Sequence, residues 1–200
     1  MIAIITGDII KSKKVAPATW LPILKNALSE YGKETKEWEI FRGDSFQLET
    51  DATHVFHAYL YIRTAIKTIP LLDVRMSIGV GEKDYKGESI LNSNGSAFIN
   101  SGEAFEELKK QTIAIKTPWD KENNLFDVLL NSAAFIIEKW NPNTSSTILF
   151  ALKNPDITQK KLAEKMGKDA GLLSRQLRKA GFDEIQKTID YCTQILLAQC

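Results

Sequence analysis

The pattern of apolar and polar positions changes near the middle of the chain. Up to Thr117, short runs of β-branched and aromatic residues alternate with stretches whose apolar positions recur at helical spacing. From Pro118 onward the spacing is helical almost throughout. We therefore predict two domains, one of strands and helices over residues 1–117 and a helical one over residues 118–200.

The first domain carries an order of strands and helices that is typical of ferredoxin-like sheets. The order is strand, helix, strand, strand, helix, strand, over the expected ranges 2–6, 17–31, 38–43, 45–50, 52–69 and 74–81. Pro17 suits a first helical turn, and Asp51 is a suitable cap for the second helix. We therefore expect an α+β fold, in which a βαββαβ domain is followed by the helical domain.

Two aspartates are expected at one edge of this sheet. The first strand lies beside the central hairpin in such an arrangement; Asp8 follows that strand, and Asp44 forms the hairpin turn with Gly43. Mg²⁺ binds one or two carboxylates together with substrate phosphates, so the pair predicts a site for this ion. Alternatively, Asp8 caps a turn and Asp44 is present because aspartate is favoured in turns.

Groups that suit a phosphate surround the two aspartates. The segment DIIKSKK offers backbone N–H groups and lysines as it turns into the first helix, although these lysines are alternatively solvated. Arg63 and Arg75 lie near the ends of a helix and a strand, where arginines are commonly surface ion-pair partners. Gly95 begins a helix whose first N–H groups suit an anion. The candidate ligand-binding residues are Lys11, Ser12, Lys13, Gly43, Arg75 and Gly95.

Composition and charge narrow the classes of function. The 200 residues are 44% hydrophobic and 26% charged, which is typical of a globular protein, and the formal net charge of +1 gives no overall attraction to nucleic acid or membrane. The start of the chain lacks a basic leader and no apolar segment approaches membrane-spanning length, so we expect a cytoplasmic protein. Cys192 and Cys200 suit neither a disulfide framework nor a zinc site, and we expect two reduced thiols.

A basic pair of short helices is expected over residues 158–180. Thr158 caps a helix that ends at Met166, Gly167 interrupts it, and a second helix covers Ala170–Lys179. The segment from Thr158 to Lys179 contains seven lysines and arginines and two acidic residues, a net charge of +5. A patch of this kind drives binding to DNA phosphates by releasing counterions.

The spacing of the two helices predicts a helix-turn-helix. Small and apolar side chains are expected to pack the helices together, namely Leu162, Ala163, Leu173 and Leu177. The second helix then enters the major groove. The candidate DNA-binding residues are Thr158, Gln159, Lys160, Lys168, Asp169, Ser174, Arg175, Arg178 and Lys179. The alternative is a basic, solvated helical hairpin that has no DNA target.

Two longer amphipathic helices flank the basic pair. The apolar stripe expected on the first consists of Leu125, Leu129, Ala133, Ile136, Ile137 and Trp140. The stripe expected on the C-terminal helix consists of Ile185, Ile189, Cys192 and Leu196. A protein of this size that binds an operator usually presents two recognition helices one DNA turn apart, so we expect a homodimer.

Several short motifs resemble successive landmarks of the class III nucleotidyl cyclase domain and its relatives with GGDEF-type palm folds. They are Asp8-Ile9 after an apolar strand, RGDSF, VRMSIGVG and NGSAFINSGEAFEEL. The whole chain resembles more closely the SatD family of small bacterial proteins, in which such a domain is followed by a helix-turn-helix region. The resemblance implies metal ligands at Asp8 and Asp44 and at the carbonyl of Ile9.

The chain departs from the cyclase pattern at positions that matter for catalysis. Lys11 replaces a glycine of the phosphate-binding turn, and Ile99 and Glu103 stand where cyclases carry an asparagine and an arginine that stabilise the transition state. An isoleucine cannot donate a hydrogen bond, and a carboxylate repels a triphosphate. The resemblance therefore implies that a nucleotide is bound without turnover.

Three hypotheses follow from the sequence. The first is a DNA-binding transcriptional regulator whose cyclase-like domain senses a nucleotide or another phosphate ligand with Mg²⁺. The second is a Mg²⁺-dependent nucleotidyl cyclase or a related nucleotide-processing enzyme. The third is an interaction protein whose sheet domain no longer binds a ligand. The basic helix pair favours the first, Ile99 and Glu103 count against the second, and Asp8 and Asp44 count against the third.

Overall fold

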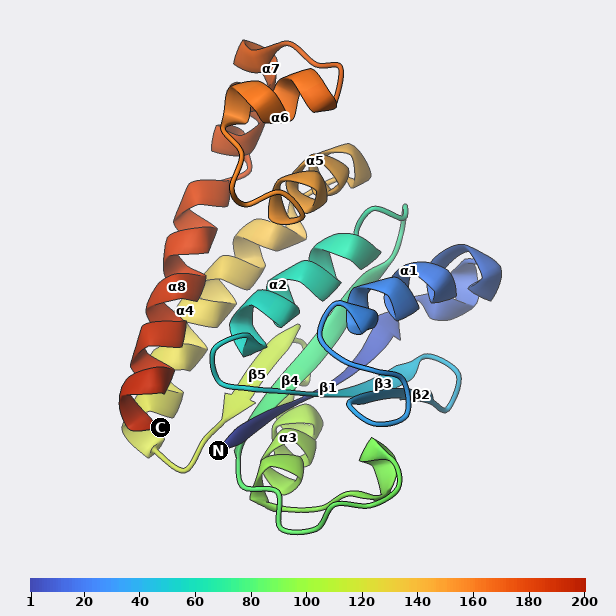
Figure 1. The fold of residues 1–200 in the computed structure, drawn as a ribbon, viewed down its shortest axis with the longest axis vertical. Helices are drawn as coiled ribbons and strands as arrows, with labels where there is room; N and C mark the ends of the chain where they lie inside the picture. The colour runs from blue at the N-terminus through green and yellow to red at the C-terminus, as the bar shows by residue number, and fades with distance from the viewer.

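The computed structural model describes residues 1–200 as an α+β fold with a five-stranded mixed sheet and eight α-helices (Figure 1). The strands are β1 (Ile2–Ile10), β2 (Trp38–Phe41), β3 (Ser45–Thr50), β4 (Asp73–Gly81) and β5 (Ile113–Lys116). The helices are α1 (Pro17–Ser29), α2 (Val55–Ile66), α3 (Ser96–Glu107), α4 (Asp120–Glu138), α5 (Pro142–Leu152), α6 (Gln159–Lys165), α7 (Ala170–Lys179) and α8 (Phe182–Gln199). The α+β class predicted from the sequence is confirmed.

The strand order in the sheet is β2-β3-β1-β4-β5, so β1 is central. The β1–β3, β1–β4 and β2–β3 pairs are antiparallel, whereas β5 runs parallel to β4 after the crossover through α3. The order of elements from β1 to β4 is the predicted one, but β1 continues to Ile10, so that Asp8 lies inside the strand. The sequence analysis missed β5 because IAIK is only four residues long, too short to show a clear alternation of apolar and polar positions.

Helix α3 covers one face of the sheet and approaches β4 closely (Figure 1). A Cβ atom added to Gly79 would lie 2.1 Å from the backbone nitrogen of Ser101, so only a glycine permits this approach. The hydroxyl of Ser101 donates to that of Thr6 at 2.8 Å, and the hydroxyl of Ser77 donates to the carbonyl of Ser101 at 2.7 Å. This face of β1 and β4 is therefore polar and held to α3 by hydrogen bonds.

Helices α1 and α2 cover the other face, and α2 is the most enclosed element of the fold. Every residue of α2 except His57 is buried. The helix begins at Val55, three residues later than predicted, because the carboxylate of Asp51 accepts the backbone N–H of His54 at 3.0 Å and stabilises a turn before the helix. A helix that is buried on nearly all sides requires other elements to cover all of those sides.

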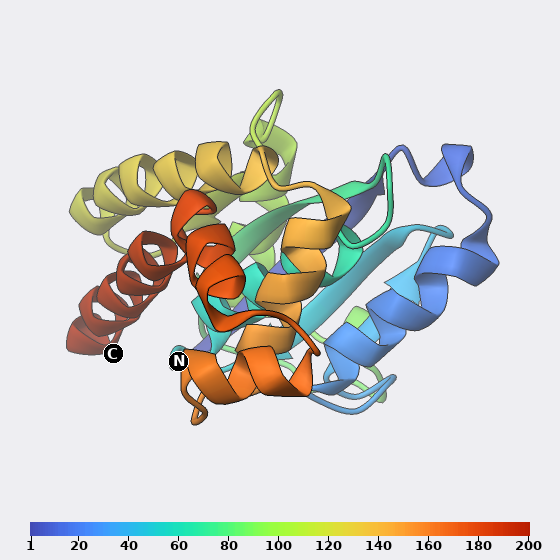
Figure 2. The same cartoon turned by 90° about the horizontal axis from the view of Figure 1, so that it is seen from above.

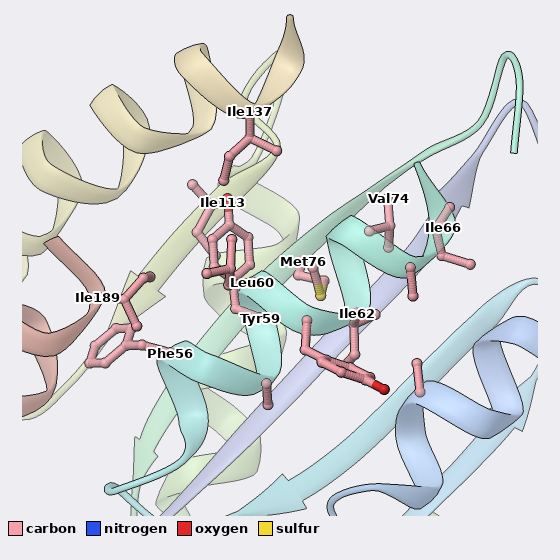
Figure 3. Packing of buried hydrophobic residues seen from close by; sticks show 14 of the residues in the cluster. Phe56, Tyr59, Leu60, Ile62, Ile66, Val74, Met76, Ile113, Ile137 and Ile189 are labelled. Carbon is pink, nitrogen blue, oxygen red and sulfur yellow. The ribbon is translucent and has the colours of Figure 1, made fainter. Parts of the chain in front are cut away.

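The C-terminal helices supply that cover. Helices α5 and α8 pack on α2, and α4 packs on β5 and α8 (Figures 1 and 2). Figure 3 shows Ile189 of α8 beside Phe56 of α2. One continuous hydrophobic core includes residues from both sides of Pro118, whereas the division into domains at that position stays a prediction.

The buried stripe of α4 differs in part from the predicted one. Ala133, Ile137 and Trp140 are buried as expected, but Phe126 and Leu130 take the inner positions of the first turns, and Leu125 is 40% exposed. The inner face is displaced by one residue because the ring of Phe126 packs against Phe56, at 5.4 Å between ring centroids. The stripe predicted for α8 is confirmed, since all four of its residues are buried. No helix combines the length and the apolar character needed to span a membrane.

A buried ion pair joins α2, β4 and α4. Arg63 is fully buried and donates from Nε and Nη2 to the two carboxylate oxygens of Asp73, both at 3.0 Å, and from Nη1 to the hydroxyl of Tyr59. The ammonium of Lys67 donates to Asp73 at 3.4 Å and to the carbonyl of Glu138 at 3.3 Å. Arg63 is therefore not the surface residue expected from its place near a helix end.

The buried pair generates a prediction for stability. Replacing Asp73→Asn leaves the charge of Arg63 buried without its counter-ion, so the free energy of unfolding falls by about 3–5 kcal/mol. Urea unfolding followed by circular dichroism measures the change. Asp84→Asn, at an exposed loop position, is the matched control and should unfold like the wild type. Equal midpoints for Asp73→Asn and the wild type would contradict this account.

The two thiols should differ sharply in reactivity. Cys192 is fully buried on α8, and burial raises the pKa of its thiol to about 12, whereas Cys200 is exposed. Because the thiolate is the reactive form, Cys192 stays protonated and inert near pH 8. Ellman's reagent should therefore titrate one thiol in the folded protein and two in concentrated guanidinium chloride. Two fast-reacting thiols in the folded protein would show that α8 is not packed as described.

Candidate functional site

Asp8 and Asp44 lie at the same edge of the sheet. Asp8 pairs in register with Ser45 of β3, and the backbone N–H of Ile9 donates to the carbonyl oxygen of Asp44 at 3.1 Å. The turn that carries Asp44 therefore lies beside the second half of β1.

Arg75 neutralises Asp8 on the face of the sheet that α3 covers. The two residues are opposite each other in the β1–β4 register, and Nε and Nη2 of Arg75 each donate to one oxygen of Asp8 at 2.7 Å. The guanidinium lies 5.2 Å from the ring centroid of Phe105 on α3. The hydrogen bonds to Asp8 raise the pKa of Arg75, and the negative charges of Asp8 and Asp44 act in the same direction. Both carboxylates therefore act on one guanidinium.

A pocket of about 410 Å³ lies beside Asp44, between the β1–α1 connection and the β2–β3 turn. We call it the Asp44 pocket; it is lined by Ser12, Lys13, Lys14, Val15, Ala16, Pro17, Trp20, Arg42, Gly43 and Asp44. The hydroxyl of Ser12 donates to the carboxylate of Asp44. Three cationic side chains face one acidic one, so the charge of the pocket favours an anionic ligand.

Trp20 adds a polar group whose hydrogen-bonding capacity is unused. It is 2% exposed, and its indole nitrogen has no hydrogen-bond partner in the protein. A buried N–H without an acceptor is costly and uncommon in folded proteins. Trp20 also lines the Asp44 pocket.

The two aspartates fit a bare metal ion poorly as they are arranged. Both oxygens of Asp8 accept hydrogen bonds from Arg75, and one oxygen of Asp44 accepts from Ser12. No group of three or more acidic, histidine or cysteine side chains has the geometry to hold a metal. A cation would have to displace the guanidinium of Arg75 from Asp8, so the donor set suits an anion better. A Mg²⁺ site formed by Asp8, Asp44 and the carbonyl of Ile9 stays a prediction.

The structure brings together only part of the predicted ligand-binding set. Ser12, Lys13 and Gly43 line the Asp44 pocket. Lys11 has a left-handed backbone and lines a different cavity, and Arg75 is bound to Asp8. Gly95 lies at the start of α3, where its backbone packs against the carbonyl of Glu82.

Among the lining residues that the sequence analysis did not propose for binding, Arg42 and Trp20 carry polar groups. Arg42 directly precedes the turn residues Gly43 and Asp44, and its positive φ of 51° places it within the turn itself. A basic residue next to a predicted phosphate-binding turn could have identified Arg42 from the sequence. Trp20 lies on an amphipathic helix, where a tryptophan ordinarily belongs to the core, so no local pattern identified it.

The basic pair formed by α6 and α7 lies at the opposite end of the long axis from α3 (Figure 1). The bounds of the two helices confirm the two predicted ones, and Thr158 and Asp169 cap them by accepting the N–H groups of Lys161 and Leu172. The packing side chains Leu162, Ala163, Leu173 and Leu177 are all buried as expected.

The nine candidate DNA-binding residues divide into two groups. Gln159, Lys160, Arg175, Arg178 and Lys179 are exposed and Ser174 is half-buried. The other three have structural partners: the side chains of Thr158 and Asp169 are helix caps, and the ammonium of Lys168 donates to the hydroxyl of Thr147 on α5 at 2.7 Å. The exposed cations thus lie on two helices that Thr158, Asp169 and Lys168 hold in place through caps and a hydrogen bond.

A family model, that of the SatD family, matches residues 1–195, which is nearly the whole chain. The chain belongs to the SatD family. Comparisons with curated proteins and with solved structures give no match. The sheet, the Asp44 pocket and the α6–α7 pair all lie within the residues matched to SatD.

Proposed function

We propose that this SatD-family protein is a DNA-binding transcriptional regulator whose sheet domain senses a phosphate-bearing ligand. The observation that carries the proposal is the α6–α7 pair, with a packed apolar interior and cations on its outside. Its seven lysines and arginines against two acidic residues stand out in a chain of net charge +1. A helix-turn-helix with α7 as its recognition helix has this character.

The sheet domain supports the sensing part of the proposal. Its first four strands have the order β2-β3-β1-β4, which is that of a ferredoxin-like sheet and agrees with a cyclase-like palm. Cyclase-like domains carry their paired aspartates at the edge where Asp8 and Asp44 lie here. The Asp44 pocket, with Lys13, Lys14 and Arg42, is our candidate for the ligand site.

Ligand binding without turnover agrees with the surroundings of Ile99 and Glu103. Ile99 is 54% exposed, and the carboxylate of Glu103 is paired with Lys116. Neither side chain lines the Asp44 pocket. The resemblance to cyclases assigns these two positions to transition-state stabilisation, which neither residue provides here. We therefore place a sensor ahead of a nucleotidyl cyclase, the alternative function.

DNA binding should depend on salt and on the outer cations of α7. The affinity for duplex DNA is expected to fall steeply as NaCl rises, because phosphate contacts release counterions. Arg178→Ala and Arg175→Ala should each weaken binding and reduce the slope of log affinity against log salt by about 1. Gel shifts with the DNA upstream of the protein's own gene, repeated over a salt series, measure both effects.

Lys121→Ala is the matched control for these variants, since it removes one exposed positive charge from α4, outside the basic pair. It should bind DNA like the wild type. Affinity that is independent of salt, or an equal loss in the control, would argue against α7 as the recognition helix. Sedimentation of the DNA complex tests the homodimer that an operator of two half-sites requires.

The Asp44 pocket should bind a nucleotide through its cations. ATP at about a hundredfold excess over its Kd is expected to raise Tm by about 5–10 °C, and Lys13→Ala and Arg42→Ala should each reduce the shift. Thermal unfolding with and without Mg²⁺ measures it. Lys86→Ala, at an exposed loop position, is the control. Repeating the scans on Asp8→Ala and Asp44→Ala shows whether Mg²⁺ takes part.

Each outcome of the nucleotide experiment separates the hypotheses. The absence of any shift would contradict ligand sensing and favour an interaction protein. Release of pyrophosphate from ATP would favour the nucleotidyl cyclase. A shift that Mg²⁺ enhances only while both aspartates are present would support the predicted metal site.

A further inference from the structure

The molecule carries a second cationic cavity, far from the Asp44 pocket along the chain. It has a volume of about 480 Å³ and lies between the end of α4, the start of α5 and one side of α7. We call it the α7 groove; it is lined by Ile136, Lys139, Trp140, Asn143, Thr144, Lys168, Leu172, Arg175, Gln176, Lys179 and Ala180.

The α7 groove combines positive charge from three parts of the chain. Lys139 follows α4, Lys168 precedes α7, and Arg175 and Lys179 lie one turn apart on α7. No acidic side chain lines the groove. The ammonium of Lys139 lies 4.0 Å from the ring centroid of Phe135 on α4, and that of Lys168 is hydrogen-bonded to Thr147. Four cationic residues around one hollow that has no acidic lining residue raise the local positive potential, and an anion bound there relieves their mutual repulsion.

The polar wall of the groove is held in place before any ligand binds. The ammonium of Lys168 donates to the hydroxyl of Thr147 at 2.7 Å. The side chain of Gln176 forms a 3.3 Å hydrogen bond with Thr147, and its amide nitrogen donates to the carbonyl of Asn143 at 3.4 Å. These bonds tie α7 to α5, so the cost of ordering the site on binding is reduced.

The remaining wall is apolar. Trp140 is buried with its indole nitrogen donating to the carbonyl of Ala180 at 2.9 Å, and Leu172 is 53% exposed at the edge of the groove. The volume lies in the range of small-molecule sites, and an apolar wall beside convergent polar groups is their common composition. A bare inorganic anion leaves this apolar surface unused.

We propose that the α7 groove is a second anion site, which takes a phosphate-bearing small molecule with an apolar portion. The phosphate contacts the four cations, and the apolar portion lies against Trp140 and Leu172. Phosphate groups of the DNA backbone share the same chemistry. The experiments therefore have to distinguish a small ligand from DNA.

The position of the groove on α7 gives the site a consequence for regulation, and this part alone rests on the proposed function. Lys168, Arg175 and Lys179 line the groove and are also candidate DNA contacts, whereas Ser174 and Arg178 do not line it. A ligand in the groove occupies three of the cations proposed to contact DNA. The bound anion therefore competes with DNA.

Inorganic pyrophosphate is the probe for the anion site, titrated into the full chain by calorimetry at low salt. Saturable binding is expected. Lys139→Ala and Lys179→Ala should each weaken it about threefold to tenfold, as loss of one charged contact does. Arg178→Ala removes the neighbouring charge of α7 outside the groove and should change the affinity less than about twofold.

Further variants separate the groove from the Asp44 pocket. Lys13→Ala and Arg42→Ala should leave the Lys139-dependent binding unchanged. Loss of all pyrophosphate binding in those two variants would assign the anion to the Asp44 pocket and overturn the proposal. An equal loss in Arg178→Ala and Lys139→Ala would also overturn it, because binding would then follow overall charge.

A competition experiment tests the link to DNA. Pyrophosphate should displace duplex DNA from the wild type, and the concentration required should rise about threefold to tenfold in Lys139→Ala, as its affinity falls. Matched NaCl is the control for ionic strength. Pyrophosphate binding that depends on Lys139 in a protein without DNA affinity would retain the anion site and reject only the regulator. DNA affinity without pyrophosphate binding would retain the regulator and reject the anion site.

Discussion

The ion pair between Arg63 and Asp73 is the interaction on which the architecture depends. A guanidinium without solvent contact is tolerated only when its charge and its donors are satisfied, and Asp73 and Tyr59 satisfy them here. Arg63 belongs to α2 and Asp73 begins β4, while Lys67 carries the network on to the last turn of α4. One charge cluster thereby sets the position of α2 between the sheet and the C-terminal helices.

The same strand connects this cluster to the edge of the sheet. Asp73 and Arg75 are two residues apart on β4, and each forms a two-pronged salt bridge, the first with Arg63 and the second with Asp8. The two pairs differ in solvent contact, since Arg63 is fully buried whereas Arg75 is 39% exposed. The buried pair is costly to break, whereas the partly exposed outer pair contributes less to stability. A buried ion pair and a partly exposed one therefore lie two residues apart on β4.

Local patterns in the sequence predict the elements well and their contacts less well. Caps and glycines located the bounds of α6 and α7 closely, because Thr158, Gly167 and Gly181 act within one turn of chain. The strand β5 was not predicted, and the inner face of α4 was predicted only in its second half, because both depend on neighbours distant in sequence. The burial of Arg63 has the same cause, since Asp73 is brought to it by the fold.

In the candidate sites too, local signals predict which residues are present, and contacts between distant segments are harder to predict. Ser12, Lys13, Gly43 and Asp44 come together because each lies close to the end of β1 or to the hairpin beside it, a relation that strand order alone implies. Arg75 was expected near phosphate, yet its hydrogen bonds go to Asp8 because the β1–β4 register places the two opposite each other. Register is a property of paired strands, and no single segment encodes it.

The enclosure of α2 restricts how this architecture can evolve. A helix buried on nearly every side has no surface of its own, so neither the sheet nor the C-terminal helices can be inherited without a replacement cover for it. Shuffling of either half into another gene would leave a wide strip of hydrocarbon facing water. The sheet and the C-terminal helices are therefore expected to be inherited together. New ligand specificities are more readily acquired by substitution around the pockets than by recombination.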